Sequence, residues 1–388
     1  MNAYFDHSAT TPVDPQVAEA MLTMLTANFG NPSSVHGWGR QAREAVDKAR
    51  QQVAALINAS PQEIIFTSGG TEADNLAILG SVATSRKPGK HLITSAVEHH
   101  AVLDTMHYLG SQGYDITVLP VNSFGQVELA ELAAAIREDT ILISIMHANN
   151  EVGTIQPIAE IGKLTKDKGI LFHTDAVQST GRITVNVEEL GVDLLTLSSH
   201  KFYGPKGAGA LYLRKGVKLS PLVHGGGQER KWRSGTENVP GIVGLGQAAE
   251  LAAEQLASRT QHLQVLSSHL ITGILENIPD AVLTGHPQKR LPGHTSFVFP
   301  GVEGESMLIM LDLQGVAASS GSACTSGSLD PSHVLIALGL PHEIAHGSLR
   351  LTLGKDNTME QVNHLLEVLP GIVSRLRDMS PLYQKGVK

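Results

Sequence analysis

The stretch EIIFTSGGTEADN, from Glu63 to Asn75, places a short apolar run directly before two glycines and the start of a helix. Residues 63–67 have the composition of a buried strand, and Thr71 lies where the helix is expected to begin. Backbone N–H groups and the positive end of the helix dipole would meet there, which favours a phosphate-binding site. An N-capped helix after a tight turn explains the segment equally well. No G-x-G-x-x-G follows a first strand and no G-x-x-x-x-G-K-[ST] occurs, so neither a dinucleotide nor a nucleoside triphosphate is favoured.

Short apolar runs alternate with amphipathic helical stretches on both sides of this segment, from about Val17 to Leu256. This alternation predicts an α/β fold with a mostly parallel sheet covered by helices on both faces. A long helical tract is expected from about Val239 to Glu276, and the runs TSFVFPG, GVAASSG and SLRLTLG beyond it predict strands of a smaller α+β unit, which the N-terminal segment joins. We therefore expect a large domain over residues 14–256 and a small α+β domain over residues 1–13 and 257–388.

The overall composition narrows the class of protein. Among 388 residues, 37 Asp and Glu outnumber 29 Lys and Arg, and the formal net charge of -8 disfavours a nucleic-acid partner. No apolar window approaches the length of a membrane span, and the N-terminus lacks a basic region followed by an apolar run. The single cysteine cannot form an internal disulfide. We expect a cytoplasmic enzyme without membrane contact.

Polar residues stand where five of the expected strands end. Ligands in open α/β sheets bind beyond the C-terminal ends of the strands, so these residues should converge on one site. They are Ser68 to Thr71, His99 with His100, Asn149 to Glu151, Asp175, and Ser199 to Lys201.

Three of these segments carry groups that suit one cofactor. Asp175 ends so apolar a run that its carboxylate needs a cationic or hydrogen-bonding partner, and a protonated pyridine nitrogen is one. Gln178, three residues on, would share its face and could bind a ring substituent. Lys201 follows a buried strand, where an amine forms Schiff bases readily, although a lysine that extends to solvent is the alternative. Together with a phosphate site, these groups favour pyridoxal phosphate.

The only cysteine, Cys324, lies in the stretch SSGSACTSGS, residues 319–328. Buried structural cysteines normally have large apolar neighbours, whereas glycine and serine favour turns, exposure and motion. This placement suggests a thiol that reaches a partner. A lone cysteine in an intracellular protein is more commonly inert, so the segment alone does not decide its role.

The chain resembles cysteine desulfurases of the NifS/IscS type, which are fold type I pyridoxal-phosphate enzymes. The resemblance extends over nearly the whole length. It rests on FDHSATTPVDP, FGNPSSVHGWG, FTSGGTEADNLAI, EHHAVL, MHANNEVGTIQP, HTDAVQ, SSHKFYGPKG, RSGTENV, SSGSACTSGS and GSLRLTLG.

The resemblance implies a role for each site residue. Lys201 would form the Schiff base and remove the substrate α-proton, while His99 stacks on the ring and assists catalysis. Further contacts to the cofactor ring and phosphate are implied for Gly70, Thr71, Asn150, Asp175, Gln178, Ser198, His200 and, from a second subunit, Thr236. The substrate amino acid would meet Asn150 and Arg350, with Arg350 binding its carboxylate.

The resemblance implies that Cys324 accepts sulfur in the reaction. Sulfur would leave L-cysteine, producing L-alanine and a persulfide on Cys324, in a small-domain loop at about residues 318–330. A homodimer would then pass the sulfur to an iron–sulfur scaffold or another acceptor, with Cys324 touching a cluster only transiently. The ending RLRDMSPLYQKGVK does not match the tail with which housekeeping members dock a scaffold protein, so the acceptor stays unnamed.

Other classes of protein compete with this interpretation. An aminotransferase of the same fold would make a keto acid, a selenocysteine lyase would not need the thiol, and a non-catalytic sulfur carrier could keep the fold. The segment HEIAH, from His342 to His346, matches the zinc-protease pattern, but Pro341 and Gly347 leave barely one helical turn for it. One cysteine also cannot supply the usual ligands of a stably bound cluster.

Overall fold

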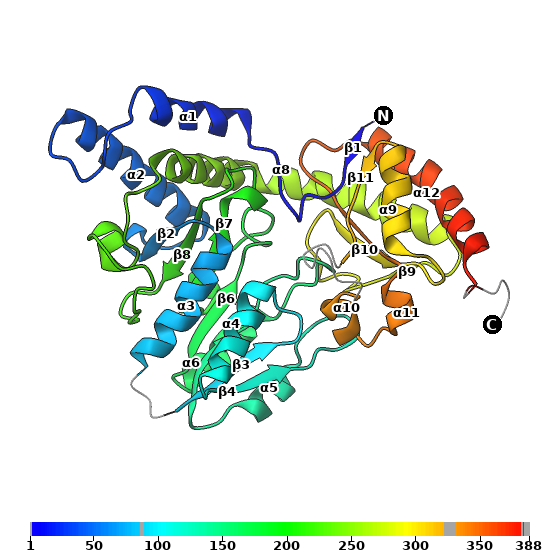
Figure 1. Cartoon of the computed structure of the whole chain (residues 1–388), viewed down its shortest axis with the longest axis horizontal. Helices are drawn as coiled ribbons and strands as arrows, with labels where there is room; N and C mark the ends of the chain where they lie inside the picture. The colour runs from blue at the N-terminus through cyan, green and yellow to red at the C-terminus, as the bar shows by residue number, and fades with distance from the viewer. Residues whose placement is uncertain (1, 86–88, 322–330, 382, 384–388) are drawn as a thin grey trace.

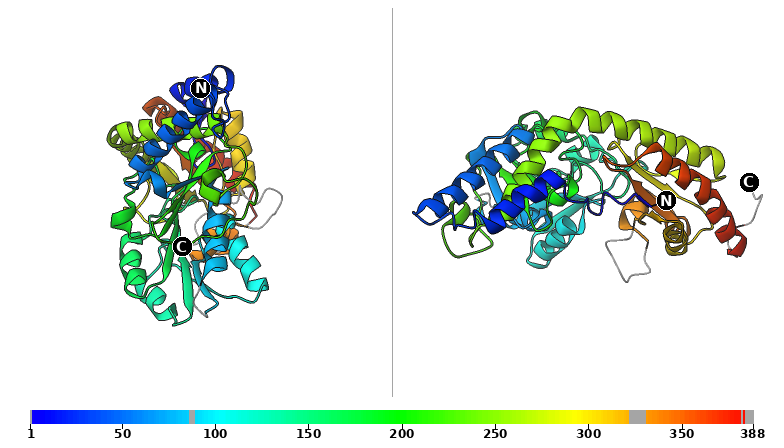
Figure 2. Two further views of the ribbon diagram at one scale, coloured as in Figure 1. Left: turned by 90° about the vertical axis from the view of Figure 1, so that its left-hand side faces the viewer. Right: turned by 90° about the horizontal axis from the view of Figure 1, so that it is seen from above.

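The computed structural model describes residues 2–85, 89–321, 331–381 and 383. Two lobes lie side by side, and helix α8 (Val239–Asn277) runs along both of them (Figure 1). The view from above shows the same helix crossing from one lobe to the other (Figure 2). Helix α8 agrees with the helical tract expected from the sequence.

The large lobe is built around a seven-stranded sheet with strand order β2-β8-β7-β6-β5-β3-β4. Strand β8 runs antiparallel to both of its neighbours, and the remaining neighbouring pairs are parallel. The strands are β2 (Ile64–Thr67), β3 (His91–Ser95), β4 (Asp115–Leu119), β5 (Thr140–Ser144), β6 (Leu171–Asp175), β7 (Leu194–Ser198) and β8 (Gly209–Leu213). The expected mostly parallel α/β sheet is confirmed.

Helices cover both faces of this sheet because neighbouring strand residues are apolar on both sides. Ile64 packs into a cluster with α2, α6 and α8, whereas Ile65 packs into another with α3. Leu142 and Ile143 divide between the two faces in the same way, since successive side chains of a strand point in opposite directions. The helices of this lobe before α8 are α1 (Pro15–Thr26), α2 (Gly37–Leu56), α3 (Gly70–Thr84), α4 (His100–Ser111), α5 (Leu129–Ala135), α6 (Ile158–Asp167) and α7 (Val187–Leu190), with short turns η1 (Pro61–Glu63), η2 (Ser199–Lys201) and η3 (Gln228–Lys231).

The small lobe combines short strands with helices, in agreement with the expected α+β unit. Its antiparallel sheet has the order β12-β10-β9, and β1 at the N-terminus pairs in parallel with β11. The strands are β1 (Ala3–Tyr4), β9 (Val282–Leu283), β10 (His294–Val298), β11 (Val316–Ala317) and β12 (Ser348–Thr352), and the helices are α9 (Gly304–Leu313), α10 (His333–Ala337), α11 (His342–Ala345) and α12 (Met359–Met379). Helix α11 ends before His346, so the two histidines of the zinc-protease pattern do not share a stable helix.

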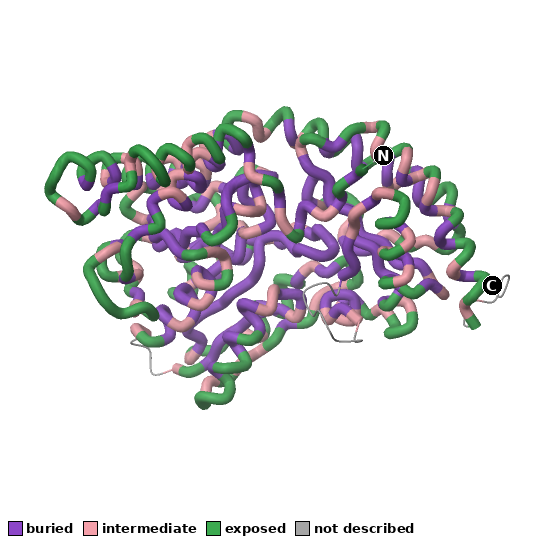
Figure 3. The backbone as a smooth tube through the Cα atoms, turned by 45° about the horizontal axis from the view of Figure 1, so that its top comes forward, coloured by how far each residue is buried: buried purple, intermediate pink, exposed green. Residues whose placement is uncertain are grey.

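The buried interior changes from one apolar cluster to another along α8. Residues of α8 up to Ala252 pack into the core of the large lobe, and residues from Leu263 onward pack into the core of the small lobe. Buried segments run through the centre of both lobes (Figure 3). The expected boundary at residue 256 falls within this continuous helix, and the division into domains stays a prediction. No helix in the described part of the chain has an apolar stretch that could cross a membrane.

Candidate active site

A cavity of about 300 Å³ lies at the C-terminal ends of the parallel strands. Each of the five polar strand ends contributes to its wall, as do the N-terminal segment and the small lobe. The cavity is lined by Ser8, Ala9, Gly70, Thr71, Asp74, His99, Met146, Asn150, Asp175, Val177, Gln178, Ser198, His200, Lys201 and Arg350. Its volume is that of a site for a small ligand.

One end of the cavity is formed by the start of α3. The helix begins at Gly70, directly after β2, so the N–H groups of its first turn face the cavity without partners in the helix itself. A Cβ atom at Gly70 would lie 2.8 Å from Val177 Cγ2, so glycine keeps this wall open. His200 Nδ1 lies 3.1 Å from Thr10 Oγ1. Burial, with Lys201 and Lys206, lowers the pKa of His200 to about 4, which leaves the ring neutral.

Another part of the wall presents a buried carboxylate and a buried amide. Asp175 ends β6, and its Oδ1 accepts a hydrogen bond from the Val177 N–H at 2.8 Å. Burial raises the pKa of Asp175 to about 6, although this backbone bond and Lys201 oppose the rise. Gln178 Nε2 donates to Ser8 O at 3.0 Å, while its Oε1 is buried and accepts no hydrogen bond from the described residues. Both groups retain capacity for a ligand.

His99 lies at the start of α4. Its Nδ1 accepts a hydrogen bond from the Ala101 N–H at 3.1 Å, which caps the helix and orients the ring. Burial lowers the pKa of His99 to about 4, with further contributions from Lys201 and His100. A neutral ring with Nδ1 as acceptor carries its proton on Nε2. The imidazole can therefore stack on a flat ligand without adding charge.

Lys201 is positioned by the short turn η2 that follows β7. Its Nζ donates hydrogen bonds to Ser8 O at 2.6 Å and to Ala9 O at 2.8 Å. The two carbonyls belong to the N-terminal segment, which the sequence analysis did not assign to the site. The motif FDHSATTPVDP marks this segment, but carbonyl groups leave no side-chain signal to read.

Arg350 brings the small lobe into the site. It lies on β12, and only 3% of its side chain is exposed. Its Nη2 donates to Asp6 Oδ1 at 2.7 Å and its Nη1 to Asn150 O at 3.2 Å, while Nε is buried and donates to no described residue. The guanidinium therefore has hydrogen-bond donors left for a further anion.

Comparisons with known proteins agree over almost the whole chain. The Aminotransferase class-V family matches residues 3–365. The chain is 56% identical over 382 residues to the cysteine desulfurase IscS of Methanosarcina thermophila, covering 98% of this chain and 94% of the relative. The chain belongs to the cysteine desulfurase family. Members of this family and of the wider class V depend on pyridoxal phosphate.

Solved structures of related proteins share the fold of this cysteine desulfurase. A NifS-like protein superposes with a TM-score of 0.91 at 42% identity, covering 97% of this chain and 100% of that one. SspA in complex with cysteine superposes with a TM-score of 0.81 at 37% identity, covering 92% of this chain and 100% of that one. The expected fold type I architecture is confirmed.

The desulfurase also buries polar groups that the sequence analysis missed. Asp74 on α3 lines the cavity, and its Oδ1 lies 3.5 Å from Nε2 of His173. The same ring contacts Ser144 Oγ at 2.8 Å and Thr196 Oγ1 at 3.1 Å. Burial and the neighbouring Asp175 raise the pKa of Asp74. The signal for Asp74 was its spacing of four residues from Gly70, which puts both on one helix face.

Two expected residues of the desulfurase are not placed at this cavity. Thr236 is exposed and lines another cavity of about 240 Å³, together with Arg233 and Glu237. Cys324 lies outside the described residues. The roles of both residues, like those of the others implied by the resemblance, stay predictions.

Proposed function

We propose that this chain moves sulfur from L-cysteine to Cys324, using pyridoxal phosphate held in the cavity at the strand ends. The balanced reaction converts L-cysteine and the Cys324 thiol into L-alanine and a Cys324 persulfide. A carbon–sulfur bond breaks, a sulfur–sulfur bond forms, and a proton takes the place of sulfur on the substrate carbon. The observation that carries the proposal is that one cavity joins Lys201, Asp175 and His99 to Arg350 of the small lobe.

The residues of the cavity suit pyridoxal phosphate. The first turn of α3 at Gly70 and Thr71, with Ser198 and His200, offers donors for the phosphate. The buried carboxylate of Asp175 suits the protonated ring nitrogen, which would bring its pKa back down. The unpartnered Oε1 of Gln178 marks an amide that can turn toward a ring substituent. When bound, the cofactor supplies an electron sink for negative charge at the α-carbon of an amino acid.

The chain's own residues handle the substrate. We assign proton transfer at the α-carbon to Nζ of Lys201, which Ser8 O and Ala9 O hold at the cavity wall. Arg350 and Asn150 bind the substrate carboxylate and orient the α-carbon. The neutral ring of His99 covers one face of the cavity and keeps water from the reacting atoms. A solved relative, SspA, binds cysteine, which supports this substrate class.

Cys324 receives the sulfur in this proposal. Its thiolate attacks the substrate sulfur, and the persulfide then passes to an acceptor protein for iron–sulfur assembly or another sulfur pathway. Contact with a cluster would be transient and made through the persulfide. We place the reaction in the cytoplasm, because a chain with a single cysteine needs no oxidising compartment. We also propose that the enzyme is a homodimer.

The test compares wild type with Cys324→Ser. Wild type, loaded with pyridoxal phosphate and mixed with L-cysteine, should change its absorption spectrum and form L-alanine and an alkylatable protein persulfide. Cys324→Ser should keep the spectral response and lose both products, because a serine hydroxyl is a poor acceptor for sulfur. Ser326→Ala, in the same stretch, serves as the matched control and should keep all three.

Other outcomes would favour the competing functions. A keto acid in place of L-alanine would indicate an aminotransferase. Near-normal L-alanine from Cys324→Ser, without a persulfide, would indicate a lyase that releases sulfur directly. A protein without a bound chromophore would indicate a non-catalytic carrier.

A further inference from the structure

The carboxylate of Asp6 is hydrogen-bonded to Arg350, the residue to which the proposed function assigns the substrate carboxylate. Its Oδ1 accepts a hydrogen bond from Arg350 Nη2 at 2.7 Å, and 19% of the Asp6 side chain is exposed against 3% for Arg350. A charge-assisted bond of this length in a buried site is a strong one. The carboxylate of an amino acid would therefore approach a cation that already has a negative partner.

The backbone around Asp6 is fixed by pairing with β12. The N–H of Thr352 donates to Phe5 O at 2.7 Å, and the N–H of His7 donates to Thr352 O at 3.2 Å. Asp6 is thus bridged to the strand that carries Arg350, two residues from Thr352. Asp6 therefore pairs with a residue two positions from Arg350 on β12, and the strand arrangement brings the two charged side chains together.

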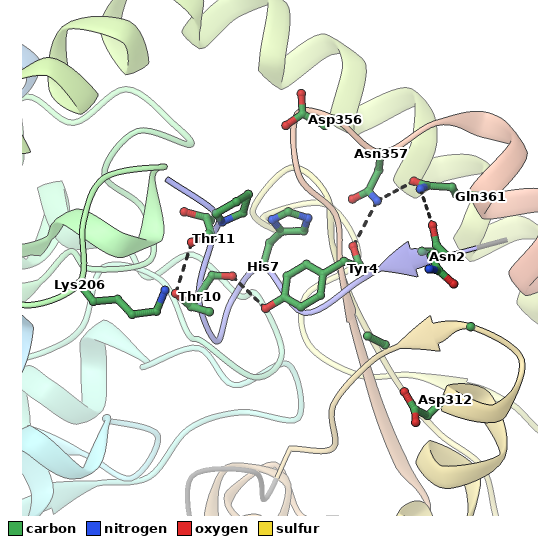
Figure 4. Close-up of a pocket in the computed structure, with 14 residues that line it drawn as sticks. Asn2, Tyr4, His7, Thr10, Thr11, Lys206, Asp312, Asp356, Asn357 and Gln361 are labelled. Carbon is green, nitrogen blue, oxygen red and sulfur yellow. Dashed lines mark hydrogen bonds between the residues drawn. The ribbon is translucent and has the colours of Figure 1, made fainter. Parts of the chain in front are cut away.

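The outer side of the N-terminal segment is anchored as well, beside a cavity of about 770 Å³ (Figure 4). The Tyr4 hydroxyl lies 3.1 Å from both Asp6 O and Thr10 O, and its single proton serves these two acceptors. The Asn357 amide donates to Tyr4 O at 3.2 Å (Figure 4). The backbone of Asp6 is therefore anchored on both sides, and its carboxylate lies on Arg350 Nη2.

Arg350 can bind a second carboxylate while it remains bonded to Asp6. Its Nε has no acceptor among the described residues, and Nη1 and Nη2 each use one donor in the contacts above. Two carboxylates on one guanidinium repel each other, and the repulsion is strong because Arg350 is buried. Burial also confines the Arg350 side chain, so orientation by Asp6 adds little to its position.

We propose that Asp6 is a built-in competitor that weakens the hold of Arg350 on the carboxylate of amino-acid substrates and products. Asp6 acts through its charge on Arg350, so it sets the affinity for carboxylates and is not a catalytic group. The consequence is release: L-alanine has the same carboxylate as L-cysteine and must leave after each turnover. This inference rests on the proposed binding of the substrate carboxylate by Arg350.

The test titrates the protein loaded with pyridoxal phosphate and follows its absorption spectrum. The probe is L-alanine, and L-alaninamide, which lacks the carboxylate, is titrated in parallel. Asp6→Asn should lower the Kd of L-alanine roughly tenfold, because the amide oxygen still accepts from Arg350 but carries no charge. The Kd of L-alaninamide should not change. Asp6→Glu, which restores the charge, should bind L-alanine as wild type does.

Asp14→Asn is the matched control, because Asp14 lies on the same segment and caps α1 by accepting from the Gln16 N–H. Asparagine caps a helix equally well, so this variant should match wild type for both probes. An unchanged or raised Kd of L-alanine in Asp6→Asn would overturn the inference, as would an equal change for L-alaninamide. A wild type that responds to neither L-alanine nor L-cysteine would instead contradict the proposed function.

Discussion

The backbone of the N-terminal segment holds the Lys201 side chain. Its Nζ lies 2.6 Å from Ser8 O and 2.8 Å from Ala9 O, and the turn that carries it follows directly from β7. The N–H of Thr11 donates to His200 O at 2.9 Å, and Thr11 Oγ1 accepts from the Tyr203 N–H at 2.8 Å. The N-terminal segment therefore fixes both sides of the Lys201 turn.

We predict that Lys201→Ala abolishes L-alanine formation and covalent attachment of the cofactor. The remaining donors for the phosphate, at the start of α3, should still allow pyridoxal phosphate to bind. Borohydride reduction followed by mass spectrometry should find the cofactor on the Lys201 peptide of wild type and on no peptide of the variant. Lys206→Ala, on the same loop, should behave as wild type. Residual turnover in Lys201→Ala would exclude the assigned role.

Asp175 makes the cofactor-free protein sensitive to pH. Burial raises its pKa from 3.8 to about 6 in the folded chain, so the unfolded chain releases this proton first as the pH rises. A raised carboxylate pKa lowers stability progressively between these two values and by a constant amount above pH 6. The burial of Asp175 lowers the free energy of unfolding by about 3 kcal/mol at most.

We predict that Asp175→Asn stabilises the cofactor-free protein above pH 6 and has little effect near pH 4. Asparagine can still accept from the Val177 N–H, but it has no charge to bury. Urea unfolding between pH 4 and 8 measures the difference, with exposed Asp47→Asn on α2 as control. The same variant should bind pyridoxal phosphate more weakly, because the ring nitrogen loses its charged partner. A loss of stability at pH 8 would contradict the argument.

At the scale of the element, the start of α3 shapes the phosphate end of the cavity. Strand β2 ends at Thr67 and α3 begins at Gly70, so the helix dipole and the free N–H groups of its first turn point toward the strand ends. Val177, which follows β6, lies so close that a Cβ at Gly70 would be 2.8 Å from its Cγ2. Any side chain at position 70 would displace Val177.

We predict that Gly70→Ala weakens binding of pyridoxal phosphate at least tenfold while the protein stays folded. The new Cβ would lie 2.8 Å from Val177 Cγ2, so the Val177 side chain must shift where it lines the cavity. Gly371→Ala on α12 is the control, because its Cβ would meet no atom within 4 Å. This control should gain about 0.5–1 kcal/mol of stability from helix propensity and bind the cofactor normally. Equal cofactor affinity in both variants would contradict the prediction.

At the scale of the whole molecule, the site is assembled from two lobes and is expected to be completed by a second chain. Arg350 comes from the small lobe and Lys201 from the large lobe, and α8 connects the two. Thr236 is exposed on the single chain and lines a different cavity. Such a position suits a residue that serves the site of a partner subunit.

We predict that mixed dimers of Lys201→Ala and Thr236→Ala chains regain activity that neither homodimer has. If Thr236 reaches across, one site of the mixed dimer holds an intact Lys201 and an intact Thr236, and the other holds neither. Co-expression with two affinity tags isolates the mixed dimer, and L-alanine formation should approach half of the wild-type value. Activity no higher than the mean of the two homodimers would place Thr236 in its own chain's site.

The fold class and the residues that line the cavity from the strand ends could be read from the amino-acid pattern alone. Apolar runs of strand length between amphipathic stretches are local patterns, and the five strands whose polar ends were recognised are β2, β3, β5, β6 and β7. Because parallel strands end on one edge of the sheet, convergence of Gly70, His99, Asp175 and Lys201 followed from the order of elements alone.

The distant groups that complete the site became visible only in the folded chain. Asp6 and Arg350 are 344 positions apart, and their contact depends on how the N-terminal segment pairs with the small-lobe sheet. The carbonyls of Ser8 and Ala9 that hold Lys201 belong to the backbone, which is chemically the same at every residue and leaves no mark in the sequence. Local periodicity reports which face of an element is buried, whereas partners across the chain are set by packing.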